Sequence, residues 1–217
     1  MKNLKTVFGT IVILFGLTSV SNAASLNGVY LEVGTSAMGV EMNGTHNDDD
    51  GDISTGSVGK TAIIGNLGIG YMTNRSNKFG FDLGYLMSPG SAKINATSDD
   101  NNTDVTFEID NNREYYIAPM VNITEEASLY LKFGKASADV TTTGDVKNPG
   151  DLSGTTIALG TVVSWGTNAF IRTEAGITDY DKISATGAGS TPGIGTDVSV
   201  SASPETAYGK IAIGYKF

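Results

Sequence analysis

Apolar and polar residues alternate with a period of two along most of this chain. In the last residues, Ile211, Ile213, Tyr215 and Phe217 fall on one side of an extended chain, while small residues and lysines fall on the other. Successive side chains of a β-strand point to opposite faces, so this period predicts strands rather than helices. Eight such stretches occur, at residues 29–40, 60–72, 78–87, 114–123, 128–136, 155–165, 169–178 and 207–217.

The breaks between these stretches alternate between long and short. Long polar breaks lie near 41–58, 89–105, 138–154 and 180–204, and short ones lie near 73–77, 123–127 and 166–168. Barrels of the bacterial outer membrane have brief turns on the periplasmic side and extended loops outside. The sequence therefore predicts an all-β fold, an eight-stranded antiparallel up-and-down transmembrane β-barrel over residues 24–217, with both termini in the periplasm.

The composition of the two faces indicates which of them points outward. One face is bulky and apolar, and the other is built of Gly, Ala, Ser and Asn with isolated charges, which suits a narrow polar interior. The bulky face carries aromatic residues near strand ends, as an interfacial girdle would: Tyr71, Phe79, Trp165, Tyr215 and Phe217. We therefore predict that the bulky face lies in lipid. The alternative is a soluble exported ligand-binding barrel, in which the apolar face would point inward.

Closure of the sheet is expected as well, because an open strand edge in hydrocarbon would expose unpaired backbone groups at several kcal/mol each. The last strand should therefore pair with the first. Pro119 cannot donate to a sheet ladder, so it is expected at a bulge or close to the periplasmic rim.

The first residues have the pattern of an export signal. Lys2 and Lys5 precede an apolar run that ends before small residues at Ser21 and Ala23. The run is shorter than the roughly 20 residues that a membrane-spanning helix needs. We predict a signal peptide at residues 1–23, cleaved after Ala23, and localisation in the cell outer membrane.

Charge and cysteine content exclude further classes. Without Lys2 and Lys5 the chain carries 12 Lys and Arg against 23 Asp and Glu, a net charge of −11. Such an acidic chain is a poor candidate for binding nucleic acid. The chain has no Cys, so an exported protein of this sequence has neither disulfides nor a thiol-ligated metal.

Charged residues on the inward face are expected to meet inside the barrel. Four acids face four bases: Glu32, Asp82, Glu114 and Glu174 against Lys60, Lys132, Arg172 and Lys210. A barrel of about eight strands is just wide enough for side chains to fill it. Enclosed charges must pair to offset desolvation, so a salt-bridged plug is favoured over a gated ion-conducting path.

Two motifs suggest ligand sites that their surroundings do not support. The tripeptide at Gly59–Thr61 resembles part of a phosphate-binding loop, but Ser54 stands where a glycine is needed and a strand follows instead of a helix.

An acidic segment with Asp48, Asp50 and Asp52 has part of the spacing of a calcium-binding EF-hand loop. His46 replaces the first ligand and Ser57 the last. A solvated acidic loop is the favoured interpretation; a weak cation contact, or a contact with cation-bridged lipopolysaccharide, is a hypothesis. We predict no resident metal and no cofactor.

Catalysis is not expected. Histidine is the usual general base, and the single His46 lies in a segment predicted to be outside the cell. No pairing of a nucleophile with a base is favoured by the sequence, so we predict a protein that is not an enzyme.

The strand layout, the export signal and the ending "GYKF" together resemble the small eight-stranded outer-membrane barrels of Gram-negative bacteria, the OmpA/OmpX and opacity-type porin superfamily. The resemblance covers residues 24–217. It implies that Ile211, Ile213, Tyr215 and Phe217 form the signal read by the barrel-assembly machinery. In "FIRTEAGITDYDKI" it also places Arg172 and Glu174 where the family often has an inward charged pair.

The resemblance leaves the role of the protein open, because members differ in function. We expect a structural or surface-interaction role without catalysis, with a salt-bridged interior and acidic extracellular loops. A small porin-like diffusion channel is the alternative. Expected partners are outer-membrane lipid, lipopolysaccharide and the assembly machinery, and a monomer is expected.

Overall fold

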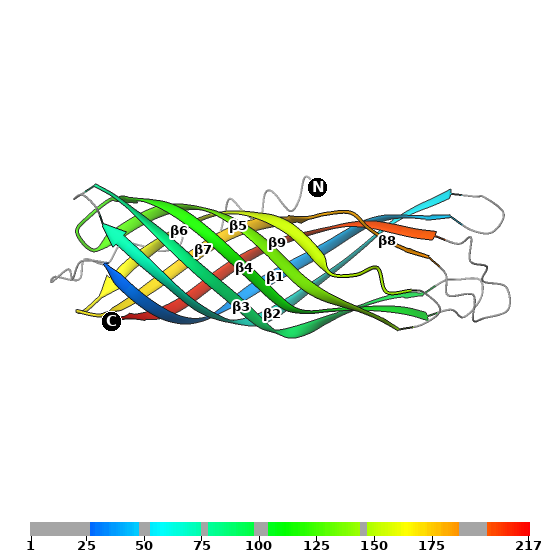
Figure 1. The fold of residues 1–217 in the computed structure, drawn as a ribbon, viewed down its shortest axis with the longest axis horizontal. Coiled ribbons are helices and arrows are strands. Elements are labelled where there is room, and N and C mark those ends of the chain that lie inside the picture. Colours follow the sequence, from blue (N-terminus) through cyan, green and yellow to red (C-terminus); the bar gives the residue numbers. More distant parts are fainter. Residues whose placement is uncertain (1–26, 48–52, 75–77, 98–103, 144–146, 187–198) are drawn as a thin grey trace.

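The computed structural model describes residues 27–47, 53–74, 78–97, 104–143, 147–186 and 199–217, and within them every regular element is a strand of one antiparallel sheet (Figure 1). The strands are β1 (Gly28–Asn47), β2 (Ile53–Asn74), β3 (Phe79–Thr97), β4 (Asp104–Asn122), β5 (Ala127–Thr143), β6 (Leu152–Trp165), β7 (Ala169–Tyr180), β8 (Ile183–Thr186) and β9 (Ser199–Lys216). The signal peptide predicted at 1–23 lies outside these residues. In the described part of the chain, no helix is long and apolar enough to cross a membrane.

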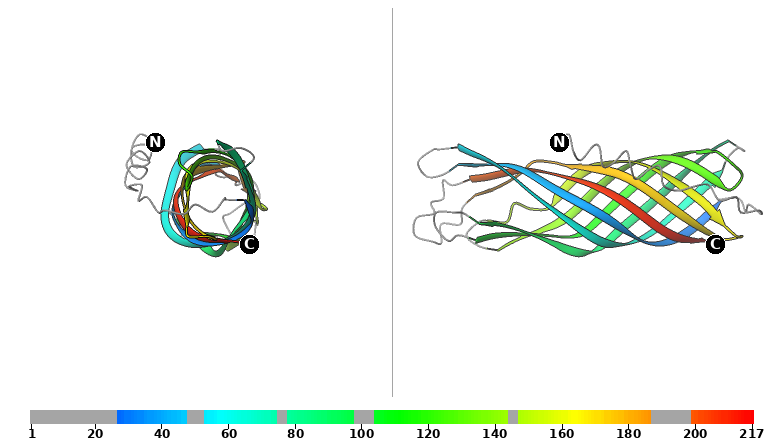
Figure 2. Two further views of the ribbon diagram at one scale, coloured as in Figure 1. Left: turned by 90° about the vertical axis from the view of Figure 1, so that its left-hand side faces the viewer. Right: turned by 180° about the vertical axis from the view of Figure 1, so that it is seen from behind.

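The sheet closes on itself to form a barrel. Each strand from β1 to β6 pairs with the next, β7 pairs with β9, and β9 pairs with β1 from Lys216↔Tyr30 to Ser199↔Asn47. The short β8 pairs with β9 just beyond the end of β7, so β7 and β8 occupy one position in the wall. The prediction of an eight-stranded antiparallel up-and-down barrel is confirmed, and the end-on view in Figure 2 shows the closed ring.

One end of the barrel carries the short connections and the C-terminus, and we call it the short-turn end (Figure 1). Residues 123–126 and 166–168 join β4 to β5 and β6 to β7 there. The last residue closes the ring, since the backbone N–H of Phe217 donates to the carbonyl of Val29 at 2.9 Å. Two of the predicted short breaks, near 123–127 and 166–168, therefore lie where the structure has turns, whereas the third, near 73–77, lies mostly outside the described residues.

The long breaks predicted at the other end are wrong in extent, because much of their length is strand. The β1–β2 ladder continues to Asn47↔Ile53, and the β3–β4 ladder continues to Thr97↔Asp104. The apolar alternation ends where the polar breaks begin. Backbone hydrogen bonds pair polar residues equally well, so the ladder runs on after the apolar pattern ends.

The pairing of β2 with β3 stops early. It covers Asn74↔Gly80 to Leu67↔Met87, although both strands continue toward the end opposite the short turns, which we call the far end. In β3 the register with β4 shifts between Ser88 and Ser91, and Gly90 has a φ of 141°. Pro89 between them has no N–H to donate to a ladder. Beyond this point the β1–β2 and β3–β4 hairpins diverge, as the right-hand side of Figure 1 shows.

Pro119 lies near the short-turn end, as one of the two predicted alternatives required. It is exposed in β4 and pairs with Phe81 of β3. The register with β5 is the same on both sides of it, at Ile117↔Phe133 and at Met120↔Tyr130. The strand therefore accommodates this proline near the rim without a bulge.

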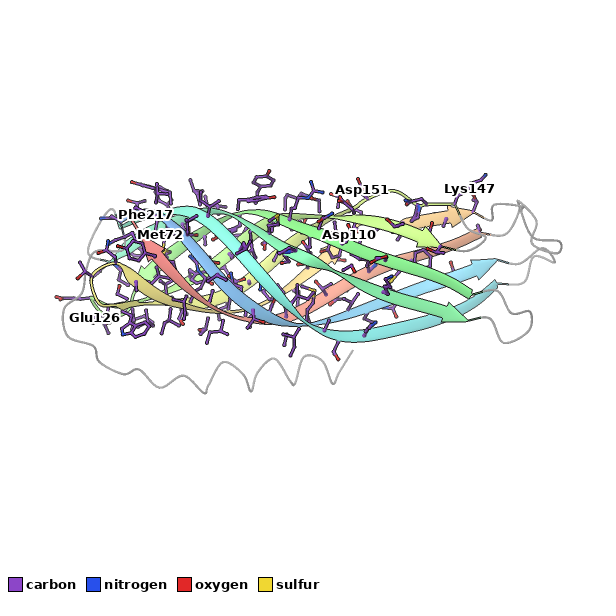
Figure 3. The ribbon with its side chains drawn as sticks, turned by 90° about the horizontal axis from the view of Figure 1, so that it is seen from below. Met72, Asp110, Glu126, Lys147, Asp151 and Phe217 are labelled. Carbon is purple, nitrogen blue, oxygen red and sulfur yellow. The ribbon has the colours of Figure 1, made fainter. Side chains whose placement is uncertain are left out.

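The bulky apolar residues point away from the barrel axis. Val33 is 61% exposed, Ile63 83% and Phe217 70%, and the aromatic residues Tyr71, Phe79, Trp165 and Tyr215 are exposed too. Figure 3 shows side chains projecting outward all around the wall near the short-turn end. In a soluble barrel this stripe would be inside, so the observed orientation is that of a barrel surrounded by an apolar medium.

A buried charge network as the candidate functional site

Seven charged side chains are buried inside the described part of the barrel. They are four acids and three bases: Glu32, Asp82, Glu114, Glu174, Lys132, Arg172 and Lys210. Around these residues, even-numbered positions point inward on each of the strands β1, β3, β4, β5, β7 and β9 that carry them. The closed ladder brings these positions to one level of the lumen, although they are far apart in the sequence.

Arg172 on β7 holds one half of this network together. Its Nε lies 2.8 Å from Oε2 of Glu32, and its Nη2 lies 2.7 Å from Oδ2 of Asp82. Three aromatic rings surround the guanidinium. Its Cζ lies 5.3 Å from the ring centroid of Tyr30, 5.2 Å from that of Tyr130 and 5.8 Å from that of Phe170. A planar guanidinium with several donors suits this position, where it joins two carboxylates and packs against rings.

Lys132 on β5 holds the other half. Its Nζ lies 2.6 Å from Oε1 of Glu174 and 3.0 Å from Oε2 of Glu114. The ammonium sits near the rings of Tyr116 and Tyr208, 5.2 and 5.4 Å from their centroids. A third contact joins β9 to β1, with Nζ of Lys210 2.9 Å from Oε1 of Glu32.

Tyrosine hydroxyls supply donors that the sequence analysis did not anticipate. Tyr130 and Tyr208 donate to the two oxygens of Glu174 at 2.6 and 2.7 Å, and Tyr30 donates to Asp82 at 2.9 Å. The alternation alone places these residues on the inward face. Their role depends on which strand faces them across the lumen, and a single sequence does not contain that information.

Glycines on neighbouring strands make room for the large inward side chains. A Cβ built on Gly160 would collide with the Tyr130 hydroxyl, and one built on Gly214 would collide with the Phe170 ring. Gly70, Gly84, Gly154 and Gly176 face Tyr30, Tyr116, Tyr180 and Tyr208 in the same way. This pairing accounts for much of the glycine found within strands.

Replacing Gly160 with alanine is expected to destabilise the barrel by about 1–3 kcal/mol, the usual cost of overpacking a filled interior. The added methyl would push the Tyr130 ring away from Glu174, whose Oε2 accepts from it at 2.6 Å. Urea unfolding in detergent micelles measures the effect. Gly209→Ala is the matched control, because a Cβ on Gly209 meets nothing within 4 Å. Equal stability of the two variants would contradict the packing argument.

Apolar clusters close the lumen on both sides of the charges. The larger cluster lies toward the short-turn end and contains Tyr30, Met72, Leu86, Tyr116, Ala118, Met120, Tyr130, Val162 and Phe170. The second lies toward the far end and contains Phe107, Ala136, Ala138, Val140, Leu152 and Tyr180. The charges are thus enclosed by packed side chains along the barrel axis.

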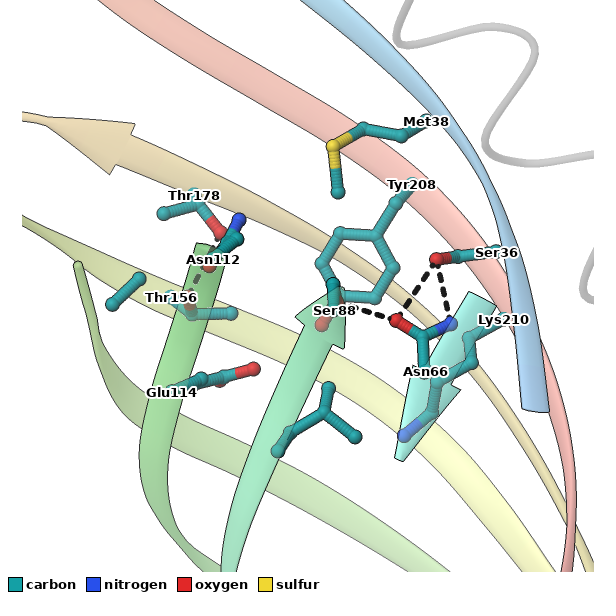
Figure 4. Close-up of a pocket in the computed structure, with 12 residues that line it drawn as sticks. Ser36, Met38, Asn66, Ser88, Asn112, Glu114, Thr156, Thr178, Tyr208 and Lys210 are labelled. Atoms are coloured by element: carbon teal, nitrogen blue, oxygen red, sulfur yellow. Dashed lines mark hydrogen bonds between the residues drawn. The ribbon is translucent and has the colours of Figure 1, made fainter. Parts of the chain in front are cut away.

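A polar cavity remains between the charges and the second cluster (Figure 4). It offers about 20 Å³ to the centre of a water molecule, which is room for roughly one water. Hydroxyl and amide groups form most of its wall: Ser36, Asn66, Ser88, Asn112, Thr156 and Thr178, with Glu114, Tyr208 and Lys210 also lining it. Asn66 joins two strands here, donating to Ser36 at 2.9 Å and accepting from Ser88 at 2.6 Å.

The structure places Lys60 outside the charge network, which corrects the prediction. Its side chain is exposed, and Nζ donates to the carbonyl of Lys93 at 2.6 Å. Lys60 does occupy an even-numbered position, and the even-numbered positions of β2 are the ones that point inward. However, β2 has already separated from β3 beyond Leu67↔Met87, so an inward position there opens to solvent rather than to an enclosed lumen.

The remaining predicted sites are placed as follows. Ile211, Ile213, Tyr215 and Phe217 are exposed on the outer face at the short-turn end. Asp48, Asp50 and Asp52 lie outside the described residues. Within those residues no group of three His, Cys, Asp or Glu is arranged to hold a metal ion.

Comparison with solved structures shows the same architecture. The outer membrane protein OprG from Pseudomonas aeruginosa aligns with a TM-score of 0.62 at 14% identity, covering 90% of this chain and 98% of that one. Outer membrane protein AlkL, solved in lipid bilayers, aligns with a TM-score of 0.52 at 14% identity, covering 94% and 97%. The chain has the fold of the small eight-stranded outer-membrane barrels.

These likenesses concern the fold alone. The outer membrane protease OmpT from Escherichia coli aligns with a TM-score of 0.49 at 8% identity, covering 92% of this chain and 100% of that one; this likeness says nothing about activity here. No protein-family model matches the chain, and no curated protein matches it in sequence.

Proposed function

We propose that this protein is an integral barrel of the outer membrane with a structural or surface-interaction role, a closed interior and no catalytic activity. The observation that carries the proposal is the interlocked interior. Arg172 and Lys132 each bind two carboxylates from other strands, and apolar side chains pack on both sides of them. Such an interior holds the strands together across the lumen and leaves little room for a solute.

The exposed apolar surface supports a position in a membrane. Soluble monomers rarely expose contiguous apolar patches larger than a few hundred Å², whereas here large apolar side chains are exposed on every long strand. A closed ladder satisfies the backbone groups that lipid cannot. Export by the predicted signal peptide at 1–23 and insertion through the assembly machinery are parts of the same proposal, with Ile211, Ile213, Tyr215 and Phe217 as the assembly signal.

A row of polar residues supports a boundary of the membrane toward the far end. On the outer face of β3 and β4, Tyr85 and Tyr115 form a tilted ring pair with centroids 4.7 Å apart, and along β4 this pair is followed by charged residues. The first of these is Arg113, bound to Asp139 at 2.7 Å. Aromatic rings followed by charges are typical of a lipid–water interface. We propose that lipopolysaccharide contacts the barrel along this row.

The proposed absence of catalysis rests on the partners of the candidate groups. Each of the four buried carboxyls has an ion-pair partner. In the sequence the single histidine is His46, and its backbone lies in β1 one residue before the strand ends. Arg172 and Lys132 are used in holding the wall, so we assign the network a structural role.

Conductance in planar lipid bilayers tests the closed interior. The purified barrel, first shown to be folded by heat-modifiable gel migration, is expected to give no steady single-channel current, because the charge network and the larger apolar cluster fill the lumen. A steady current that changes in Glu174→Gln but not in the exposed control Lys60→Met would establish a diffusion channel instead. Partition of the folded protein into the aqueous phase without detergent would reverse the membrane assignment.

A further inference from the structure

The buried network contains one more acid than base. Among the described residues, the buried charged side chains are four carboxyls against Lys132, Arg172 and Lys210, so the network has a net charge of −1 when every group is ionised. An uncompensated buried charge is costly. The excess is expected to be removed by a bound positive charge, and the question is which carboxyl receives it.

Three of the four carboxyls are well supplied with donors. Asp82 accepts from Tyr30 at 2.9 Å and from Arg172 at 2.7 Å. Glu32 has an ion pair with Arg172 at 2.8 Å on Oε2, without hydrogen-bond geometry, and accepts a hydrogen bond from Lys210 at 2.9 Å on Oε1. On Glu174, Oε1 accepts from Lys132 and Tyr208, and Oε2 accepts from Tyr130. Each of these oxygens therefore has a partner that stabilises negative charge.

Glu114 has the poorest supply. Its Oε2 has a single partner, Lys132, at 3.0 Å, and that ammonium is closer to Glu174, at 2.6 Å. Among the described residues, its buried Oε1 has neither a hydrogen-bond partner nor an ion-pair partner. Only 8% of the side chain is exposed, so bulk water does not solvate it. Of the carboxyl oxygens in the network, this one offers the least stabilisation to a negative charge.

The polar cavity described above adjoins this carboxyl. Figure 4 shows the Glu114 side chain extending from β4 toward the space between Thr156, Tyr208 and Asn66. A carboxylic acid has an O–H donor that a carboxylate lacks, and hydroxyl and amide groups that can accept a hydrogen bond line this cavity.

We propose that Glu114 is a proton-binding site, a neutral carboxylic acid at neutral pH that carries one exchangeable proton for the whole network. The proton comes from bulk water and forms an O–H bond at Oε1, which takes the net charge of the network from −1 to zero. The titratable groups facing Glu114 are Lys132 on β5, Glu174 and Tyr180 on β7, and Tyr208 and Lys210 on β9.

Infrared spectroscopy with ¹³C in the glutamate side-chain carboxyls tests this site directly. We expect the wild-type barrel, folded in micelles at neutral pH, to show one carbonyl band of a protonated carboxylic acid that shifts with the glutamate label. The band should disappear in Glu114→Gln. Glu114→Leu serves the same purpose if the glutamine variant does not fold.

Glu108→Gln is the matched control on the same strand. Glu108 is partly exposed and forms an ion pair with Lys93 at 3.4 Å. Hydrogen bonds from Ser91 and Lys93 lower its pKa, so it is ionised at neutral pH and its removal should leave the band unchanged. Three results would overturn the proposal: no protonated band in the wild type, a band that follows an aspartate label instead, or a band that persists in both Glu114 variants.

Discussion

Replacing Arg172 with methionine is expected to lower the free energy of unfolding of the barrel by about 3–5 kcal/mol, the cost of removing one partner from a buried ion pair. Methionine is shorter but also unbranched along its stem, and it fills part of the space between the rings of Tyr30 and Tyr130. It cannot replace the bonds to Glu32 and Asp82, so both carboxylates lose their guanidinium. Glu32 keeps Lys210, whereas Asp82 loses the one cation that pairs with it among the described residues.

Equilibrium unfolding in urea, followed by gel mobility and tryptophan fluorescence, measures this loss. Arg113→Met is the matched control, because its pair with Asp139 is partly exposed and such pairs contribute about 0–1 kcal/mol. Adding Asp82→Asn to Arg172→Met removes the unpaired negative charge of Asp82, so the double variant should recover part of the lost stability. The two substitutions should therefore be non-additive in a double-mutant cycle. Similar stabilities for Arg172→Met and Arg113→Met would refute the bracing role of the network.

Replacing Leu159 with arginine is expected to destabilise the folded barrel by about 2–4 kcal/mol in a lipid bilayer, the cost of a charge on the lipid face near the midplane. Leu159 lies in the apolar part of β6, is 42% exposed and faces outward between Leu131 and Ala175. The lumen is not touched by this change. The effect therefore depends on the medium around the barrel and not on its packing.

Refolding into lipid vesicles at a series of urea concentrations provides the measurement. Ser153→Arg is the control on the same face of the same strand, exposed near the start of β6 where the outer surface is polar, and it should change stability little. In a soluble barrel, water would solvate an arginine at position 159, and the substitution would change the free energy of unfolding little. Equal stabilities of the two variants in vesicles would therefore contradict the membrane assignment.

The inward face shows how far sequence reasoning reaches for the site. Parity alone identified Glu32, Asp82, Glu114, Lys132, Arg172, Glu174 and Lys210, and all of them are buried together. The same parity selected Lys60, which the structure places in solvent. The alternation determines which face of the sheet a side chain lies on. A side chain is enclosed only where its strand is also paired with the neighbouring strand, and β2 is no longer paired with β3 at Lys60.

The period of two, the short turns and the bulky outer stripe can be predicted from the order of residues, because they follow from local backbone geometry and from the surrounding medium. Which charges meet becomes known only from the folded barrel. The contact of Arg172 with Glu32 and Asp82, the glycine under each large inward ring and the unpartnered oxygen of Glu114 depend on the stagger between distant strands. That stagger is set by hydrogen-bond register around the closed ring, and no local pattern encodes it.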